Sequence, residues 1–138
     1  MSSSTTEPVD TLVLASEADV VRVRQAVRAA GVSVALSLVD QTKLVTATSE
    51  LARNTLVYGG GGQVIIRVQE QDRRRGVVVE FVDEGPGIAD VGLAMTDGWT
   101  SGSGLGLGLS GAKRLVDQFE LETVPERGTT IRVTKWKR

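Results

Sequence analysis

The sequence predicts an α+β fold, a two-layer sandwich in which helices cover one face of a mixed, mostly antiparallel sheet. One observation is the order of the patterns: a strand, two helices, two strands, a long glycine-rich stretch, a helix and two strands. A second is size, because 138 residues, 41% of them hydrophobic, suffice for one domain with a core. We therefore expect residues 10–138 to form a single domain and residues 1–9 to be disordered.

The first half of the chain supplies a strand and two helices. A strand is predicted at residues 10–15, and Ser16 can cap the helix that follows and ends at Gly31. A longer helix is predicted at residues 37–58, before four consecutive glycines. The residues at helical spacing expected to face the core are Val20, Val23, Val27 and Ala30 in the first helix, and Val39, Leu44, Ala47, Leu51 and Thr55 in the second.

The second half is predicted to complete the sheet. Residues 63–68 and 76–82 alternate between apolar and polar side chains, and the polar link 69–75 is expected to be a solvated hairpin end. The segment of residues 83–111 is longer than a simple connecting loop in so small a domain. Such long segments are typically functional. A helix at about 110–119 and strands at 120–123 and 129–136 follow.

Composition excludes several classes of function. The chain has no histidine and no cysteine, which excludes Ser-His-Asp triads, histidine or thiolate zinc sites, cysteine nucleophiles and an autophosphorylated histidine. A net charge of −1 gives no field that would attract nucleic acid. Because no apolar run approaches the ~18 residues of a membrane span, we expect a cytoplasmic protein without nucleic-acid or membrane partners.

A first candidate site is the glycine run Gly104, Gly106 and Gly108, directly ahead of a predicted helix. Backbone without Cβ atoms can approach a phosphate closely, and a helix N-terminus offers free N–H groups, so the run indicates an anion site. A flexible loop without a ligand is the alternative. The run also fits G-x-G-x-x-G with Gly111, but a dinucleotide fold would need a strand directly before it.

A second candidate lies where the strand at 76–82 ends. Asp83 can accept a hydrogen bond from an exocyclic amine such as that of a purine, while Gly85 and Gly87 leave room for a flat ring. Taken alone, the same composition is equally typical of a simple turn.

A third candidate is the pair Glu50 and Asn54 on the long second helix. A spacing of four places both on one helical face. Facing a phosphate pocket, they would supply a general base and a neutral oxygen ligand for Mg²⁺. A solvated helix edge is the alternative.

Together, these clusters resemble the motifs of a known superfamily. Glu50-Leu-Ala-Arg-Asn54, Asp83-Glu-Gly-Pro-Gly87, Gly104-Leu-Gly-Leu-Gly108 and Gly128-Thr129-Thr130 are similar in order and spacing to the N box, G1 box, G2 box and closing Gly-Thr of the GHKL ATPases. Within that superfamily the chain resembles, over about residues 10–138, the bacterial anti-sigma kinases and the stressosome switch serine/threonine kinases.

The resemblance implies a fold, ligands and partners. It implies a Bergerat-type fold that binds ATP and Mg²⁺ and phosphorylates a STAS-domain partner; on release, such a kinase binds and activates a PP2C-type phosphatase. A homodimer is a further expectation. The implied roles are Glu50 as the base, Asn54 as the Mg²⁺ ligand, Asp83 on the adenine amine, Gly85 and Gly87 along the ring, Gly104, Gly106 and Gly108 in the lid, and Thr129 or Thr130 closing the base pocket.

One departure bears on the choice within the family. Anti-sigma kinases carry a basic residue shortly before the glycine lid, whereas residues 76–112 contain no Lys or Arg. Phosphoryl charge would then rest on Mg²⁺, backbone N–H groups and Lys113. This favours the switch kinase over an anti-sigma factor that sequesters a sigma subunit and phosphorylates its antagonist. An ATP-gated adaptor without catalysis is the other alternative.

Overall fold

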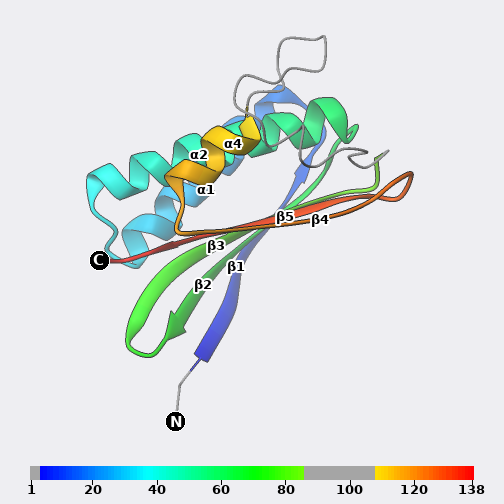
Figure 1. Cartoon of the computed structure of the whole chain (residues 1–138). Coiled ribbons are helices and arrows are strands. Elements are labelled where there is room, and N and C mark those ends of the chain that lie inside the picture. Colours follow the sequence, from blue (N-terminus) through cyan, green and yellow to red (C-terminus); the bar gives the residue numbers. More distant parts are fainter. Residues whose placement is uncertain (1–3, 86–107) are drawn as a thin grey trace.

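The computed structural model describes residues 4–85 and 108–138. Within them, five strands form one sheet in the order β1-β2-β3-β5-β4, and every strand pair is antiparallel. Helices cover one face and leave the other open (Figure 1), which confirms the predicted two-layer α+β sandwich. The elements are β1 (Ser4–Leu14), α1 (Glu17–Ser33), α2 (Leu38–Tyr58), β2 (Gly62–Gln71), β3 (Arg74–Asp83), α4 (Gly108–Leu115), β4 (Gln118–Val124) and β5 (Gly128–Trp136).

The first strand begins earlier than the sequence predicts. β1 pairs with β2 along its whole length, so residues 4–9 lie in the sheet and the expectation that they are disordered is wrong. The register shifts between Pro8 and Asp10, which marks a bulge. Because proline and a bulge both interrupt alternation, the sequence pattern conceals this half of the strand.

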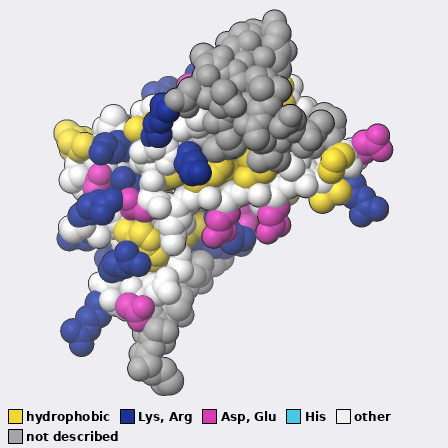
Figure 2. Space-filling model, in the orientation of Figure 1, with side chains coloured by type: hydrophobic (Ala, Val, Ile, Leu, Met, Phe, Trp, Pro, Cys, Tyr) yellow, Lys and Arg dark blue, Asp and Glu magenta, His cyan; other side chains and the backbone are white. Residues whose placement is uncertain are grey.

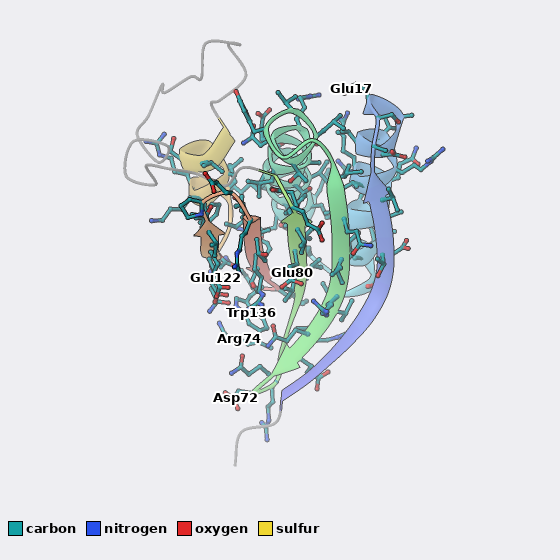
Figure 3. All side chains as sticks on the ribbon, turned by 90° about the vertical axis from the view of Figure 1, so that its right-hand side faces the viewer. Glu17, Asp72, Arg74, Glu80, Glu122 and Trp136 are labelled. Atoms are coloured by element: carbon teal, nitrogen blue, oxygen red, sulfur yellow. The ribbon has the colours of Figure 1, made fainter. Side chains whose placement is uncertain are left out.

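A two-residue turn joins β2 to β3. Asp72 and Arg73 both have positive φ, 52° and 70°, as a type I′ hairpin turn requires. The sequence lacks the usual Asn-Gly or Asp-Gly signal, so the polar link predicted at 69–75 is too long and both strands extend into it. The Arg74 guanidinium lies over the Trp136 ring, with Cζ 4.4 Å from the ring centroid (Figure 3).

The core lies between the sheet and the helices and is mainly aliphatic. The stripe predicted in α1 is confirmed, and in α2 four of the five residues expected in the core are buried. Val39 is the exception, with 64% of its surface exposed, because its neighbour Asp40 turns toward β5 in the first turn of α2. In the part of the chain that the structure describes, no helix is long and apolar enough to cross a membrane.

The third predicted helix is shorter than expected. α4 ends at Leu115, because the N–H of Asp117 already donates to the carbonyl of Thr134, 2.9 Å away, and the chain then pairs with β5. Leu109 and Ala112 are buried and face the core, so α4 packs beside α2 on the same side of the sheet.

Asp19 closes the N-terminus of α1. Its Oδ2 accepts the backbone N–H groups of Ala15 at 2.8 Å and Ser16 at 3.0 Å, the part that Glu or Gln plays in a capping box. The hydrogen bond from Ala15 is the main cause that lowers the pKa of Asp19 below its ordinary value of 3.8.

Replacing Asp19 with Ala is expected to lower the unfolding temperature at neutral pH. Because the carboxyl pKa is lower in the folded than in the unfolded chain, the stabilisation is present above the ordinary pKa of 3.8 and is lost as the pH falls through the folded value. Thermal unfolding followed by circular dichroism should therefore show the difference closing in acid. The exposed neighbour Glu17 gives the control Glu17→Ala; a deficit in Asp19→Ala that is independent of pH would contradict the assignment.

The end of β5 is anchored by a buried cation. Lys135 is only 5% exposed, and its Nζ lies 3.6 Å from Asp40 Oδ1 and 3.7 Å from Asp117 Oδ1. Asp117 also accepts the N–H of Trp136 and pairs with Arg138. This cluster joins the start of α2, the end of α4 and β5, on the side of the molecule where Lys and Arg side chains gather (Figure 2).

The open face of the sheet carries a row of charges. Glu80, Arg132 and Glu120 are in register across β3, β5 and β4. Arg132 binds both carboxylates, with nitrogen–oxygen distances of 2.9 Å to each. A row of paired charges suits a solvated surface, so the apolar core and the candidate site lie on the opposite, helix-covered side.

Candidate active site

Helix α2 places Glu50 and Asn54 one turn apart. The helix begins after Ser37, whose Oγ accepts the Asp40 N–H at 3.1 Å, and it buries Leu44 and Leu51 completely against the core. This packing fixes the rotation of the helix and leaves the Glu50 side chain 41% exposed and Asn54 half-buried. The structure therefore brings the predicted base and the predicted magnesium ligand to one helical face.

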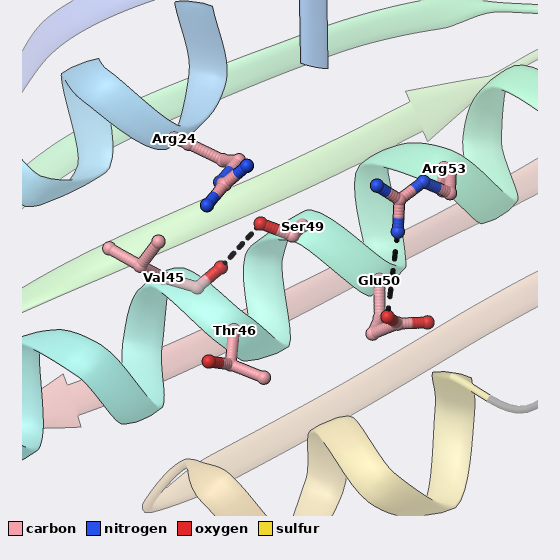
Figure 4. Close-up of a pocket in the computed structure, with 6 residues that line it drawn as sticks. All are labelled: Arg24, Val45, Thr46, Ser49, Glu50 and Arg53. Atoms are coloured by element: carbon pink, nitrogen blue, oxygen red, sulfur yellow. Dashed lines mark hydrogen bonds and ion pairs between the residues drawn. The ribbon is translucent and has the colours of Figure 1, made fainter. Parts of the chain in front are cut away.

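Arg53 stands beside the predicted base. Its Nη1 lies 3.6 Å from Glu50 Oε1, and both side chains are about two-fifths exposed, at 39% and 41% (Figure 4). Sequence reasoning did not single out Arg53, although opposite charges three residues apart on a helix are a detectable signal. The pair places a permanent positive charge next to the carboxylate.

Asp83 ends β3 on the helix-covered side of the sheet. It follows Val77, Val79 and Phe81 at alternate positions, and all three are buried in the core. Its Oδ1 accepts the N–H of Gly85 at 2.9 Å, which fixes the carboxylate in an Asx turn. Because a carboxylate offers about four acceptor positions, Asp83 retains capacity to accept from a ligand amine.

Thr129 shares the side of Asp83. The two residues are in register between β3 and β5, and Thr129 alternates with the core residues Ile131 and Val133. Its Oγ1 lies 3.0 Å from Thr123 Oγ1 on β4. Thr130, the next residue along the strand, belongs to the opposite face, so of the two threonines considered from the sequence only Thr129 lies on the same side of the sheet as Asp83.

Three glycines let backbone approach Asp83 closely. A Cβ on Gly59 would lie 2.6 Å from Asp83 Cγ, and one on Gly128 would lie 2.1 Å from the Asp83 carbonyl oxygen. A Cβ on Gly85 would lie 2.8 Å from Gly59 Cα. The end of α2 thus seats directly on the end of β3. Sequence reasoning took Gly59 only as part of a flexible loop.

The two ends of the site are joined by α2. At about 1.5 Å of rise per residue, Glu50 lies roughly 13 Å along the helix from Gly59, and Asn54 lies between them. Asp83 and Glu50 are therefore too far apart to contact one small group. Gly108 begins α4, whereas Gly87, Gly104 and Gly106 lie outside the described residues.

A hollow of about 210 Å³ lies between α1 and α2 and borders Glu50 (Figure 4). Ser49 Oγ donates to the Val45 carbonyl at 2.8 Å, which holds the hydroxyl against the floor. We call this feature the α1–α2 hollow, and it is lined by Arg24, Val45, Thr46, Ser49, Glu50 and Arg53.

The protein oxygens near Asn54 are too few to bind Mg²⁺ by themselves, so they fit the ion only when phosphate oxygens of a ligand also coordinate it. Within residues 4–85 and 108–138, no group of three or more His, Cys, Asp or Glu side chains could hold a metal ion. The Asn54 amide oxygen is a suitable hard ligand, and Mg²⁺ commonly takes one or two protein oxygens and completes its shell with substrate phosphates and water.

The chain is similar in sequence to known proteins. Residues 39–138 match the family described as histidine kinase-, DNA gyrase B-, and HSP90-like ATPases. Serine/threonine-protein kinase RsbT of Bacillus subtilis (strain 168) is 42% identical over 123 residues, covering 89% of this chain and 92% of that protein. Anti-sigma F factor of the same strain is 33% identical over 103 residues, covering 70% of this chain and 69% of that protein.

A solved structure shares the fold. The SiaB–SiaC complex from Pseudomonas aeruginosa contains a chain that superposes with a TM-score of 0.53, covering 94% of this chain and 90% of that one. Sequence identity is 12%, so this likeness concerns the fold alone.

Proposed function

The chain belongs to the family of histidine kinase-, DNA gyrase B- and HSP90-like ATPases, in which it is an RsbT-like serine/threonine protein kinase, and we propose that Glu50, Asn54 and Asp83 carry its reaction. The observation that supports these roles is that one helix, α2, borders both the Asp83 cluster at its end and the half-exposed Glu50 in its middle. Residues 10–138 form the catalytic unit.

Asp83 recognises the base of ATP. Its carboxylate, fixed by the Gly85 N–H, accepts the exocyclic amine of adenine, and the close packing of Gly59 against Asp83 and Gly85 holds this end of β3 in place. Thr129, on the same side and paired with Thr123, closes the pocket with a hydroxyl group. Gly87, Gly104, Gly106 and Gly108 are assigned to nucleotide binding with them.

Glu50 acts on the protein substrate. Its carboxylate accepts the proton of a serine or threonine hydroxyl while that oxygen bonds to the γ-phosphorus of ATP. The bond from the γ-phosphorus to the β,γ-bridging oxygen breaks, ADP leaves with that electron pair, and the proton remains on Glu50. Asn54 would hold Mg²⁺, which would neutralise charge on the phosphate oxygens.

The proposed partners are a STAS-domain protein as substrate and scaffold, and a PP2C-type phosphatase that the released kinase binds and activates, in the cytoplasm. The likeness to RsbT over nine-tenths of both chains supports this choice. The 33% identity to an anti-sigma F factor supports a second candidate, an anti-sigma factor that phosphorylates its antagonist.

Incubation with γ-labelled ATP, Mg²⁺ and a STAS-domain protein from the same genome tests the proposal. We expect label on the STAS-domain protein with the parent kinase and far slower labelling with Glu50→Gln. ATP binding without transfer would favour an ATP-gated adaptor, and stable association with a sigma factor would favour the anti-sigma factor. Both results would contradict the switch kinase.

A further inference from the structure

The end of the β2–β3 hairpin carries an excess of positive charge. Arg73, Arg74 and Arg75 follow one another through the turn into β3, and all three are exposed. The N–H of Lys137 donates to the Arg75 carbonyl at 2.7 Å, which places a fourth cation beside them, directly after β5. We call these four residues the basic hairpin surface. Because the whole chain has a net charge of −1, this surface is a local reversal of its charge.

The structure neutralises little of this charge. In the part of the chain that the structure describes, Arg73 and Lys137 form no ion pair. Arg75 Nε lies 4.0 Å from Glu70 Oε2, at the limit of an ion pair, and both side chains are exposed. The Arg74 guanidinium lies over an aromatic ring, which carries no net charge. The basic hairpin surface can therefore bind anionic groups from outside the chain.

Two features of the basic hairpin surface cost stability. Arg73 follows Asp72 in the type I′ turn with a φ of 70°, a conformation in which a residue with a Cβ is strained and glycine is favoured. Arg75 and Lys137 are like charges on neighbouring extended segments, an arrangement that is destabilising in a sheet. Neither the turn nor the sheet needs these cations, whereas an anionic partner would relieve the repulsion between them.

The basic hairpin surface lies far from the nucleotide site. Arg74 and Asp83 are the two ends of β3, a strand of 10 residues, so at about 3.4 Å per residue they lie roughly 30 Å apart. Figure 1 shows the hairpin end extending beyond the helices. A partner bound at the hairpin end therefore leaves Asp83 uncovered, and it does not have to bring a hydroxyl group to Glu50. The surface suits a partner other than the phosphoryl acceptor.

The charge pattern favours a protein over a nucleic acid. Guanidinium groups match carboxylates in two-point contacts, so Asp and Glu side chains are suitable ligands. A nucleic acid presents negative charge along its whole length, and the remainder of this chain is net negative and would repel it. The ring of Trp136, next to Arg74, is buried and offers little surface on which a base could stack.

We propose that the basic hairpin surface binds an acidic surface of the PP2C-type phosphatase partner. The inference rests on the proposed function and adds to it the part of the kinase that this partner contacts. The STAS-domain substrate, which must reach Glu50, binds elsewhere on the molecule.

Binding of the PP2C-type phosphatase from the same genome to the full-length kinase, measured by isothermal titration, tests the inference. Arg73→Glu and Lys137→Glu are each expected to weaken binding by about tenfold, and the double variant by about a hundredfold, because juxtaposed like charges oppose association. Arg28→Glu, an equal change of charge at an exposed position of α1, is the matched control and should bind as the parent does. Added salt should weaken binding of the parent more steeply than that of the double variant.

A turn variant separates binding from stability. Arg73→Gly gives the turn the Asp-Gly pair that type I′ geometry favours, so the unfolding temperature should rise by a few degrees while the affinity for the phosphatase falls. Transfer of phosphate to the STAS-domain protein should be unchanged in Arg73→Gly and in the charge reversals. A loss of binding together with a lower unfolding temperature in Arg73→Gly would contradict the assignment, because the loss would then reflect misfolding.

Three other results would overturn the inference. They are a phosphatase affinity unchanged by both reversals, an equal loss in Arg28→Glu, and a raised KM for the STAS-domain protein in the reversals. Binding of the parent to a short DNA duplex in preference to the phosphatase would also overturn it. Failure of the parent to bind the phosphatase would remove that partner and the inference with it, whereas the kinase reaction is judged separately by transfer to the STAS-domain protein.

Discussion

Replacing Glu50 with Gln is expected to lower kcat for phosphoryl transfer by roughly 10²- to 10⁴-fold, the usual contribution of a general base, and to leave ATP affinity unchanged. Gln has nearly the same shape, so the packing of α2 is retained, but a neutral amide cannot take the proton of the attacking hydroxyl. Single-turnover transfer from γ-labelled ATP measures the chemical step, and fluorescence titration with a labelled nucleotide measures binding.

The matched control for this loss is Glu122→Gln. Glu122 is an exposed carboxylate on β4, well separated from α2 (Figure 3), and its removal changes the net charge by the same amount. If Glu50→Gln transferred phosphate as fast as Glu122→Gln, Glu50 would not be the base. If it lost ATP binding as well, Glu50 would contribute to the nucleotide pocket rather than to the transfer step.

Replacing Asp83 with Asn is expected to weaken ATP binding by about ten- to a hundredfold, because a hydrogen bond to a charged group is worth about 1.5–3 kcal/mol. The amide can still accept the Gly85 N–H but offers the adenine amine a neutral acceptor in place of a carboxylate. Isothermal titration with ATP and, for comparison, with GTP should show that the loss is confined to ATP, since guanine carries an oxygen where adenine carries the amine.

The variant Gly59→Ala tests the role of the Asp83 carboxylate in ATP binding without changing Asp83 itself. Its new Cβ would lie 2.6 Å from Asp83 Cγ and 2.7 Å from the carbonyl oxygen of Thr55, so both the Asp83 side chain and the end of α2 must move although the charge of Asp83 is kept. We expect weaker ATP binding with an unchanged rate constant for transfer at saturating ATP. Gly60→Ala is the control for backbone effects in the same loop, because a Cβ there meets nothing within 4 Å, although its φ of +73° is less favourable for alanine. Normal ATP affinity in Gly59→Ala would argue against a base pocket at Asp83.

Local patterns predicted most of the fold. The spacing of apolar residues located both long helices and the central strands, because apolar residues recur about every 3.6 positions along one face of a helix and every two positions along one face of a strand. The errors arose where a partner strand decided the outcome. The N-terminal half of β1 and the Asp72–Arg73 turn are set by pairing with β2 and β3, which local propensity does not encode.

In the candidate site too, local patterns predicted some features, whereas contacts between distant elements decided others. The spacing of Glu50 and Asn54 on one helical face could be read from the sequence, and the structure has them there. The choice between Thr129 and Thr130 could not, because it depends on the register of β5 against Asp83. Gly59 was missed for a related reason, since its contact with Asp83 arises from packing between elements that are separate in sequence.

The position of β5 between β3 and β4 constrains how the protein folds during synthesis. Both neighbours are made before β5, and they become joined only when β5 inserts between them. Until then one edge of β3 is unpaired. Asp40, near the start of α2, also has no ion pair with Lys135, because Lys135 is translated 95 residues later. Contacts of such long sequence separation slow folding and leave strand edges exposed to other chains. The contact between Thr129 and Asp83, which are in register between β5 and β3, therefore forms late, after β5 has been synthesised.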